Sequence, residues 1–472
     1  MEVIVKFVYD NILSIAMMVA LMFAGIFITI KMRAFQFTRF GYSCKNTIGG
    51  LFDKKLHTGK EGSVSPFQAV TTALAGTIGT GSIAGVATAI VAGGPGAIFW
   101  MWISALLGMI TKYSEIVLSL TYREKNEKGA WVGGPMYYIK NGLGIKWLAV
   151  VFAVFAMIAC LGTGNAVQSN SISGVLEESF KIPTWVTGLV LVVLVSAVIL
   201  GGVKRIASVN EKLVPIMAVF FIIASILALI FNASSIPTAF ALIFKEAFNF
   251  KAIFGGVAGY GIFSALRYGV ARGVFSNEAG LGSAPIAHAA SSAEDPVKQG
   301  LWGIFEVFIT TIVICTMTAL VILSSDTFLN AYDPSVKLNL GAGIDGARFS
   351  ALAFGDALSY IGTVVISVST VFFALSTILG WGYYGEVCAT YLFPNKSEKA
   401  VLVYRLIYIV FVFVGAVADI GIVWALTDCF NVLMALPNLI AIIALSGVVK
   451  NATVKHFAAK KAAAQESEAE KN

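Results

Sequence analysis

The chain has 472 residues, of which 58% are hydrophobic and only 12% are charged, and its formal net charge is +7. Soluble proteins carry about 25% charged residues, and no soluble fold buries so much apolar surface. The composition therefore excludes a soluble protein and predicts an all-α polytopic membrane protein.

Eleven apolar runs are long enough to cross a bilayer, whose hydrocarbon core is about 30 Å thick and needs roughly 20 apolar residues per helix. The predicted spans are 12–30, 66–92, 95–121, 147–172, 184–203, 209–231, 255–290, 297–324, 359–392, 401–419 and 422–449. We expect the first span to be an uncleaved anchor and not a signal peptide, because Lys31 and Arg33 follow its apolar run.

The positions of the basic residues account for the net charge. If the N-terminus lies outside, the predicted inner loops and the C-terminal tail hold 23 of the 33 Lys and Arg residues, and the predicted outer segments hold six. Lys and Arg gather on the cytoplasmic side of membrane proteins. We therefore expect a plasma-membrane protein with its N-terminus outside and its C-terminus in the cytoplasm, and no nucleic-acid partner.

Residue types that bind metals or nucleotides do not form recognisable sets. The cysteines are scattered without a C-x-x-C pair, and His57, His288 and His456 are isolated, whereas zinc and haem sites need grouped ligands. Gly79-x-Gly81 lacks the later glycine and the lysine of nucleotide-binding loops. No organic cofactor is expected.

The ten spans after the first divide into two sets of five. The predicted units are an extra N-terminal helix with a cytoplasmic loop (1–65), a first five-helix repeat (66–231), a second five-helix repeat with external segments (232–449) and a cytoplasmic tail (450–472). An odd number of spans makes the second set antiparallel to the first. Such inverted repeats hold substrate near the midplane, between discontinuous helices.

The opening span of each repeat contains a candidate break. The second span has four glycines between Gly76 and Gly85, and each glycine costs about 1 kcal/mol relative to alanine in a helix. The seventh span holds the glycine-rich run 269–285 and would be about 54 Å long if fully helical. Glycines at this spacing can also serve only close helix packing, but the matched pair favours a transport site.

The breaks predict where ligands bind. Backbone N–H groups near Gly81 and Ser82 begin a half-helix and could hold a carboxylate. Carbonyls near Ala75 and Ile78 end the preceding half-helix and could hold a cation. Sodium and a zwitterionic substrate would then lie together.

Two motifs resemble the signature of the alanine or glycine:cation symporter family. They are the run from Gly93 to Gly108, GGPGAIFWMWISALLG, and the run from Ser276 to Pro285, SNEAGLGSAP. The resemblance covers nearly the whole chain, and Ser291-Ser292 departs from the expected alanines. It implies a LeuT-type fold of two inverted five-helix repeats after one extra helix, and sodium-coupled uptake of alanine or glycine by alternating access.

The same resemblance implies which residues bind. The implied sodium ligands are Ala75, Ile78, Phe373, Ser376 and Thr377. The implied substrate cradle comprises Thr80 and Gly81, with Gly79 permitting the turn, and a second unwound stretch that contains Gly273, Phe275, Ser276 and Asn277, with Gln168 and Asn170 completing the wall. Hydroxyls in membrane helices often bond only their own preceding carbonyl, and Gln168 and Asn170 could instead join helices.

Ionisable residues inside spans leave alternatives open. Candidates for function or for structural pairs are Arg267, Glu278, Glu306 and Asp428. Arg272 could close an outer gate or fix the break, and Lys112 and Glu115 are predicted to form a structural pair. The main rival function is a proton-coupled carrier that uses Glu306 or Glu278. A membrane-embedded enzyme is disfavoured because no nucleophile, base or metal set is present. A passive channel is the other alternative, and it would differ from a carrier in lacking exchange of labelled against unlabelled substrate. The oligomeric state is left open.

Overall fold

A computed structural model describes residues 8–51, 53–59, 63–248, 259–332, 346–418 and 421–469, and it is nearly all helical. The helices of the N-terminal part are α2 (Ser14–Lys31), α3 (Phe35–Thr38), α4 (Phe40–Asn46), α5 (Lys54–His57), α6 (Pro66–Thr77), α7 (Ala84–Gly93), α8 (Ala97–Thr121), α9 (Pro135–Tyr138), α10 (Lys146–Leu161), α11 (Val167–Phe180), α12 (Thr184–Ile199), α13 (Gly202–Phe231) and α14 (Ile236–Ala247). Those of the C-terminal part are α15 (Gly259–Asn277), α16 (Ala284–Ala289), α17 (Pro296–Val307), α18 (Thr316–Leu323), α19 (Asp326–Ala331), α20 (Gly346–Leu392), α21 (Ser397–Val417), α22 (Gly421–Ala444) and α23 (Ser446–Ala469).

Short segments of other geometry join these helices. A two-stranded antiparallel hairpin, β1 (Glu124–Lys125) and β2 (Trp131–Val132), follows α8. A π-helical turn, η5 (Gly162–Ala166), joins α10 to α11, and another, η8 (Phe308–Cys315), joins α17 to α18. The long helix α20 contains a non-helical residue at Ser359, where the ninth span was predicted to begin.

Eight helical stretches in the described residues are long and apolar enough to cross a membrane. They are Ser14–Lys31, Ala97–Thr121, Lys146–Phe180, Gly202–Phe231, Pro296–Leu323, Gly346–Leu392, Pro394–Val417 and Leu426–Ala444. The second predicted span is divided between α6 and α7, and the fifth contains only the 16 residues of α12. Residues 255–258 of the seventh predicted span lie outside the described residues.

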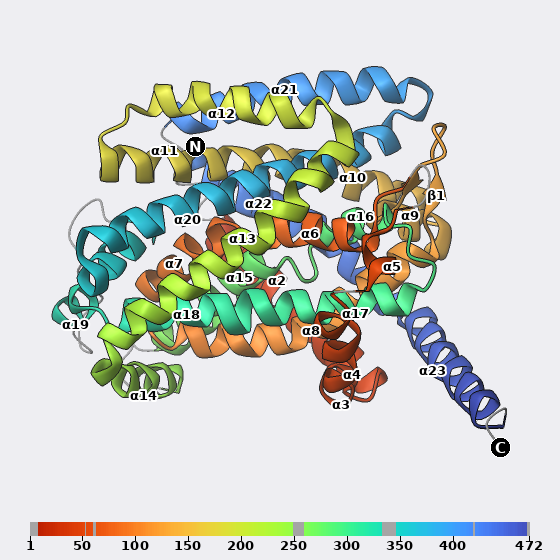
Figure 1. The fold of residues 1–472 in the computed structure, drawn as a ribbon, viewed down its shortest axis with the longest axis horizontal. Coiled ribbons are helices and arrows are strands. Elements are labelled where there is room, and N and C mark those ends of the chain that lie inside the picture. Colours follow the sequence, from red (N-terminus) through yellow and green to blue (C-terminus); the bar gives the residue numbers. More distant parts are fainter. Residues whose placement is uncertain are drawn as a thin grey trace.

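The helices form a buried centre and an apolar periphery. The most apolar stretch of α8 is 83% buried, and α8 packs against α15 and α17, whereas the corresponding stretch of α21 is only 28% buried. Figure 1 shows α12 and α21 side by side at one edge of the bundle and α23 extending away from it. Large apolar side chains such as Val193 (67% exposed) and Ile216 (63% exposed) face outward. This surface suits lipid, and the polar helix breaks lie inside the bundle.

Candidate functional site

The second predicted span is broken where its glycines and polar residues are concentrated. Helix α6 ends at Thr77 and α7 begins at Ala84, with one 3-10 turn over Thr80–Ser82 between them. Every residue of this connection is buried. Its backbone polar groups must therefore be satisfied by protein groups or by a ligand, because neither bulk water nor lipid reaches them.

Gly79 is needed for space and not for a turn, so the predicted reason was wrong. Its φ of −112° and ψ of −162° are extended values that any residue adopts. A Cβ atom at this position would lie 2.4 Å from Oγ1 of Thr377 in α20. The absence of a side chain thus lets the first break touch α20 directly.

Three of the predicted sodium ligands meet at this contact. Oγ1 of Thr377 lies 2.8 Å from the carbonyl oxygen of Ala75 in α6 and 2.9 Å from the carbonyl oxygen of Phe373 in α20. The hydroxyl of Ser376 donates to the same Phe373 carbonyl at 2.9 Å. Ile78 is buried at the end of α6, three residues after Ala75.

This cluster has more oxygen acceptors than protons. The Ser376 and Thr377 hydroxyls carry one proton each, so the two carbonyl and two hydroxyl oxygens keep lone pairs that could bind a cation. Its bond to Phe373 is the local i−4 bond that the sequence left as an alternative, but the contact to Ala75 joins a second helix. A hard cation prefers such oxygens, so these residues suit sodium.

Gln168 reaches the first break, as the resemblance implies. Its Oε1 accepts hydrogen bonds from the backbone N of Thr80 at 3.3 Å and from Oγ1 of Thr80 at 2.9 Å. Its Nε2 donates to the carbonyl of Thr163 in η5 at 2.9 Å. The wide π-helical turn therefore fixes the amide that satisfies the unwound backbone.

Asn170 does not reach either break. Its Nδ2 lies 3.2 Å from the carbonyl oxygen of Gly415 and 3.1 Å from that of Ala418, at the end of α21. The side chain satisfies carbonyls that the helix end leaves without intrahelical partners. Asn170 thus joins two helices, which was the alternative to a place in the pocket wall.

The second break lies later in the chain than predicted. Helix α15 continues through Asn277, so Gly273, Phe275, Ser276 and Asn277 are helical and not unwound. The interruption covers residues 278–283, with positive φ at Glu278, Gly280 and Gly282.

Two residues at the end of α15 nevertheless face the first break. Oγ of Ser276 lies 3.0 Å from Oγ of Ser82. A Cβ on Gly81 would lie 2.9 Å from the ring of Phe275. The two broken spans therefore cross in close contact.

The other two predicted cradle residues in α15 face different neighbours. A Cβ on Gly273 would lie 2.7 Å from Oγ of Ser104 in α8, so this glycine serves close packing. Nδ2 of Asn277 donates to Oγ1 of Thr311 in η8 at 3.0 Å. Neither residue has a described contact with the first break.

Buried charged side chains hold the second break. Nζ of Lys112 donates to the carbonyl oxygen of Asn277 at 2.9 Å and lies 3.0 Å from Oε2 of Glu306. Oε1 of Glu306 lies 2.9 Å from Nε2 of His288 in α16. All three ionisable side chains are fully buried. Lys112 of α8 thus holds the end of α15 before the break, and Glu306 links Lys112 to His288 after it.

The prediction that Lys112 pairs with Glu115 was wrong. Oε1 of Glu115 instead accepts a hydrogen bond from the backbone N of Gly282 at 3.1 Å and another from Nδ2 of Asn438. Spacing along one helix could not indicate this, because both partners come from distant parts of the chain. Lys112 and Glu115 therefore each bond to a backbone group at the second break.

An ion pair and an aromatic pair lie beside the end of α15. Nη2 of Arg272 lies 3.1 Å from Oδ2 of Asp428 in α22. Its guanidinium carbon is 5.6 Å from the ring centroid of Phe275 and 5.7 Å from that of Trp424, and the two rings are 5.8 Å apart. No local pattern pointed to Trp424, because tryptophans in membrane helices commonly lie at the bilayer interface.

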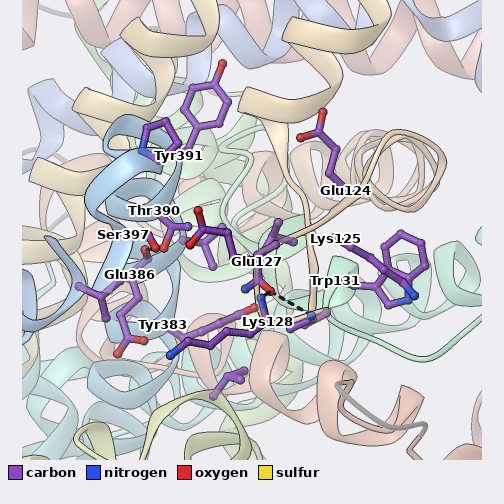
Figure 2. Close-up of a pocket in the computed structure, with 18 of the residues that line it drawn as sticks. Glu124, Lys125, Glu127, Lys128, Trp131, Tyr383, Glu386, Thr390, Tyr391 and Ser397 are labelled. Atoms are coloured by element: carbon purple, nitrogen blue, oxygen red, sulfur yellow. Dashed lines mark hydrogen bonds between the residues drawn. The ribbon is translucent and has the colours of Figure 1, made fainter. Parts of the chain in front are cut away.

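A separate cavity of about 710 Å³ opens between the β1–β2 hairpin and the facing ends of α20 and α21. Figure 2 shows Glu127 and Lys128 of the hairpin facing Glu386 and Ser397. Lys140 offsets the effect of burial on Glu124, so the pKa of Glu124 is lowered overall. None of the predicted binding residues lines this cavity.

Two crossing helices that are interrupted inside an apolar bundle are typical of membrane transporters. The model of the sodium:alanine symporter family matches residues 1–471. The chain belongs to that family.

Known proteins agree with this assignment. The chain is 45% identical to the sodium/alanine symporter AgcS of Methanococcus maripaludis over 93% of each protein. It is 37% identical to the probable sodium/glutamine symporter GlnT of Bacillus subtilis, over 98% of this chain and 92% of GlnT. Among solved structures, it shares the LeuT-type fold of MhsT in complex with L-phenylalanine, with a TM-score of 0.58 and 14% identity over 82% of this chain and 90% of MhsT.

Proposed function

We propose that this symporter couples the entry of sodium to the uptake of alanine or glycine by alternating access. The observation that carries the proposal is the cluster of Ala75, Phe373 and Thr377 oxygens at the contact between the first break and α20. Sodium would enter this cluster with Ser376 and Ile78 as further ligands. Family membership and the likeness to the sodium/alanine symporter AgcS support sodium and alanine.

The substrate would bind at the crossing of the two broken spans. The unwound backbone at Gly79, Thr80 and Gly81 would hold its carboxylate, since N–H groups at a helix start favour anions. Gln168 and Ser276 would border the site through Thr80 and Ser82. The close approach of Phe275 to Gly81 would limit the size of the substrate side chain, which favours alanine and glycine over larger amino acids.

One sodium ion per cycle is enough for useful accumulation. Moving one charge down about 100 mV supplies about 2.3 kcal/mol, which corresponds to an accumulation of about fifty-fold before the sodium concentration gradient is added. Glu306, the first candidate for proton coupling, is held between Lys112 and His288. A carboxylate held by two partners is poorly placed to exchange a proton in every cycle, which favours sodium.

We further propose eleven membrane spans, with one extra helix before two inverted repeats of five. The N-terminus would lie outside and the C-terminus in the cytoplasm. In this orientation the Arg272–Asp428 pair lies on the outer side of the second break, where it would close over a bound substrate. Sodium would order the first break, the amino acid would bind next, and rocking of one helix group would open the site inward.

The test is sodium dependence in the Ser376→Ala/Thr377→Ala double variant. Uptake of labelled alanine into proteoliposomes should lose its response to a sodium gradient, because two ligands are removed. Thr370→Ala is the matched control, since Thr370 is buried in the same helix and its hydroxyl donates only to the Ile366 carbonyl among described contacts. Undiminished sodium-driven uptake in the double variant would contradict the assignment of Ser376 and Thr377 as sodium ligands.

A further inference from the structure

Glu278 is the residue at which the second break begins. It is 1% exposed and has a positive φ of 57°. Residues other than glycine rarely adopt this conformation, so surrounding interactions must hold Glu278 in place. Its side chain provides them.

The Glu278 carboxylate joins its own break to α20. Oε1 accepts a hydrogen bond from Nε1 of Trp381 at 2.6 Å, and Oε2 accepts one from the hydroxyl of Ser283 at 2.6 Å. Ser283 is the last residue before α16. One carboxylate therefore spans the break from end to end and fixes it to Trp381.

The same carboxylate also lies beside Gly76 of α6. A Cβ on Gly76 would lie 3.1 Å from Oε1 of Glu278 and 2.8 Å from the hydroxyl of Tyr384. Because Gly76 has no side chain, the Glu278 carboxylate can approach α6. Gly79 allows the Thr377 hydroxyl to approach the first break in the same way. Glu278 is therefore bonded to α20 and lies against the glycine face of α6, the two helices that supply the proposed sodium ligands.

These contacts adjoin the proposed sodium ligands along the chain. Gly76 follows Ala75 directly, and Trp381 lies one helical turn after Thr377, on the same face of α20. Trp381 also packs against η5, where a Cβ on Gly164 would lie 2.2 Å from Cβ of Trp381. A change in the distance between α6 and α20 at the sodium ligands should therefore move the groups that surround the Glu278 carboxylate.

Resting on the proposed function, we propose that Glu278 is the positioning residue that couples sodium binding at the first break to the geometry of the second. It binds neither sodium nor the amino acid. Its bonds to Trp381 and Ser283 transmit the approach of α6 and α20 to residues 278–283 and hence to the end of α15. The neighbouring carboxylates Glu115 and Glu306 bind backbone and charged groups around the break and have no described contact with α6 or α20.

The test compares Glu278→Gln, Trp381→Phe and the double variant in proteoliposomes. Each single variant should raise the sodium concentration for half-maximal alanine uptake about tenfold, the effect of one lost charge-assisted hydrogen bond. The double variant should be no worse than Trp381→Phe alone, because Glu278→Gln removes the charge from the same hydrogen bond that Trp381→Phe removes entirely. Because coupling between two binding sites is reciprocal, the same variants should also weaken the dependence of the apparent alanine affinity on sodium.

Two variants control for general damage. Trp302→Phe removes a buried indole from α17, and Glu386→Gln neutralises a buried carboxylate of α20 that pairs with Arg405. Both should keep the wild-type sodium dependence. If Glu278→Gln does not fold, Trp381→Phe alone decides, with sodium-induced thermal stabilisation in detergent as the second measurement.

Three results would overturn the proposal. Multiplying effects in the double variant would show that the two residues act separately. An unchanged sodium requirement in Trp381→Phe would remove the link to α20, and loss of all transport in Glu278→Gln with normal transport in Trp381→Phe would make Glu278 a coupling-ion carrier. Failure of the proposed function is distinguishable from these results, because alanine uptake by the wild-type protein would then be independent of sodium.

Discussion

At the scale of single residues, the first break is defined by which atoms its glycines admit. Gly79 admits the Thr377 hydroxyl, Gly81 admits the Phe275 ring and Gly76 admits the Glu278 carboxylate. Each contact joins α6 or the break to an element far away in the sequence. The glycines thus act through close approach, and the cluster of oxygens around Thr377 depends on it.

Gly79→Ala should abolish sodium-driven uptake. Its Cβ would lie 2.4 Å from Oγ1 of Thr377, so the hydroxyl must move away from the Ala75 carbonyl, and overpacking of this kind costs about 1–3 kcal/mol. Uptake of labelled alanine in proteoliposomes should fall at least about tenfold. Gly85→Ala is the control, because its Cβ would make an ordinary contact of 3.8 Å with Phe275, and equal losses in both variants would contradict the account.

At the scale of elements, the two breaks are stabilised by different chemistry. Neutral groups satisfy the first, among them the Gln168 amide and the hydroxyl of Thr318, which donates to the carbonyl of Ser82 at 2.9 Å. Charged groups hold the second, including the fully buried pair of Lys112 and Glu306. Buried charges are costly to leave unpaired, so the second break should be the more rigid one.

Lys112→Met should therefore destabilise the protein strongly. Removal of one partner of a buried pair costs about 3–5 kcal/mol, because the other charge remains without compensation. The midpoint of thermal unfolding in detergent should drop in Lys112→Met and recover in part in Lys112→Met/Glu306→Gln, in which the stranded charge is also removed. A double variant less stable than the single one would show that the pair does not act in this way.

The sequence predicted the first break more accurately than the second, for a physical reason. In the seventh predicted span, some glycines allow close helix packing and others allow a backbone turn with positive φ. A Cβ on Gly269 would lie 2.3 Å from the carbonyl oxygen of Ala97, so this glycine, like Gly273, allows α15 to pack on α8 while it stays helical. Gly280 and Gly282, with φ of 90° and 82°, are the ones that interrupt the chain. Composition cannot separate packing glycines from turn glycines.

At the scale of the whole molecule, composition alone predicts a membrane protein, because the outer helices expose apolar side chains that a soluble protein would bury. Outer helices such as α13 and α21 leave most of their apolar residues at least partly exposed, whereas α8 is largely buried and carries Lys112 and Glu115. Hydropathy identified the uninterrupted spans, but it could not show that the second span consists of two short helices. Contacts such as Glu278 with Trp381 depend on how distant helices cross, which no local pattern encodes.

The central claim is sodium-coupled uptake of a small amino acid, and transport by the purified protein tests it most directly. Proteoliposomes with an inward sodium gradient and a negative interior should accumulate labelled alanine above its outside concentration, and labelled glycine should be compared in parallel. Replacement of external sodium by choline at fixed pH should abolish the accumulation. Equal accumulation in choline would contradict the account.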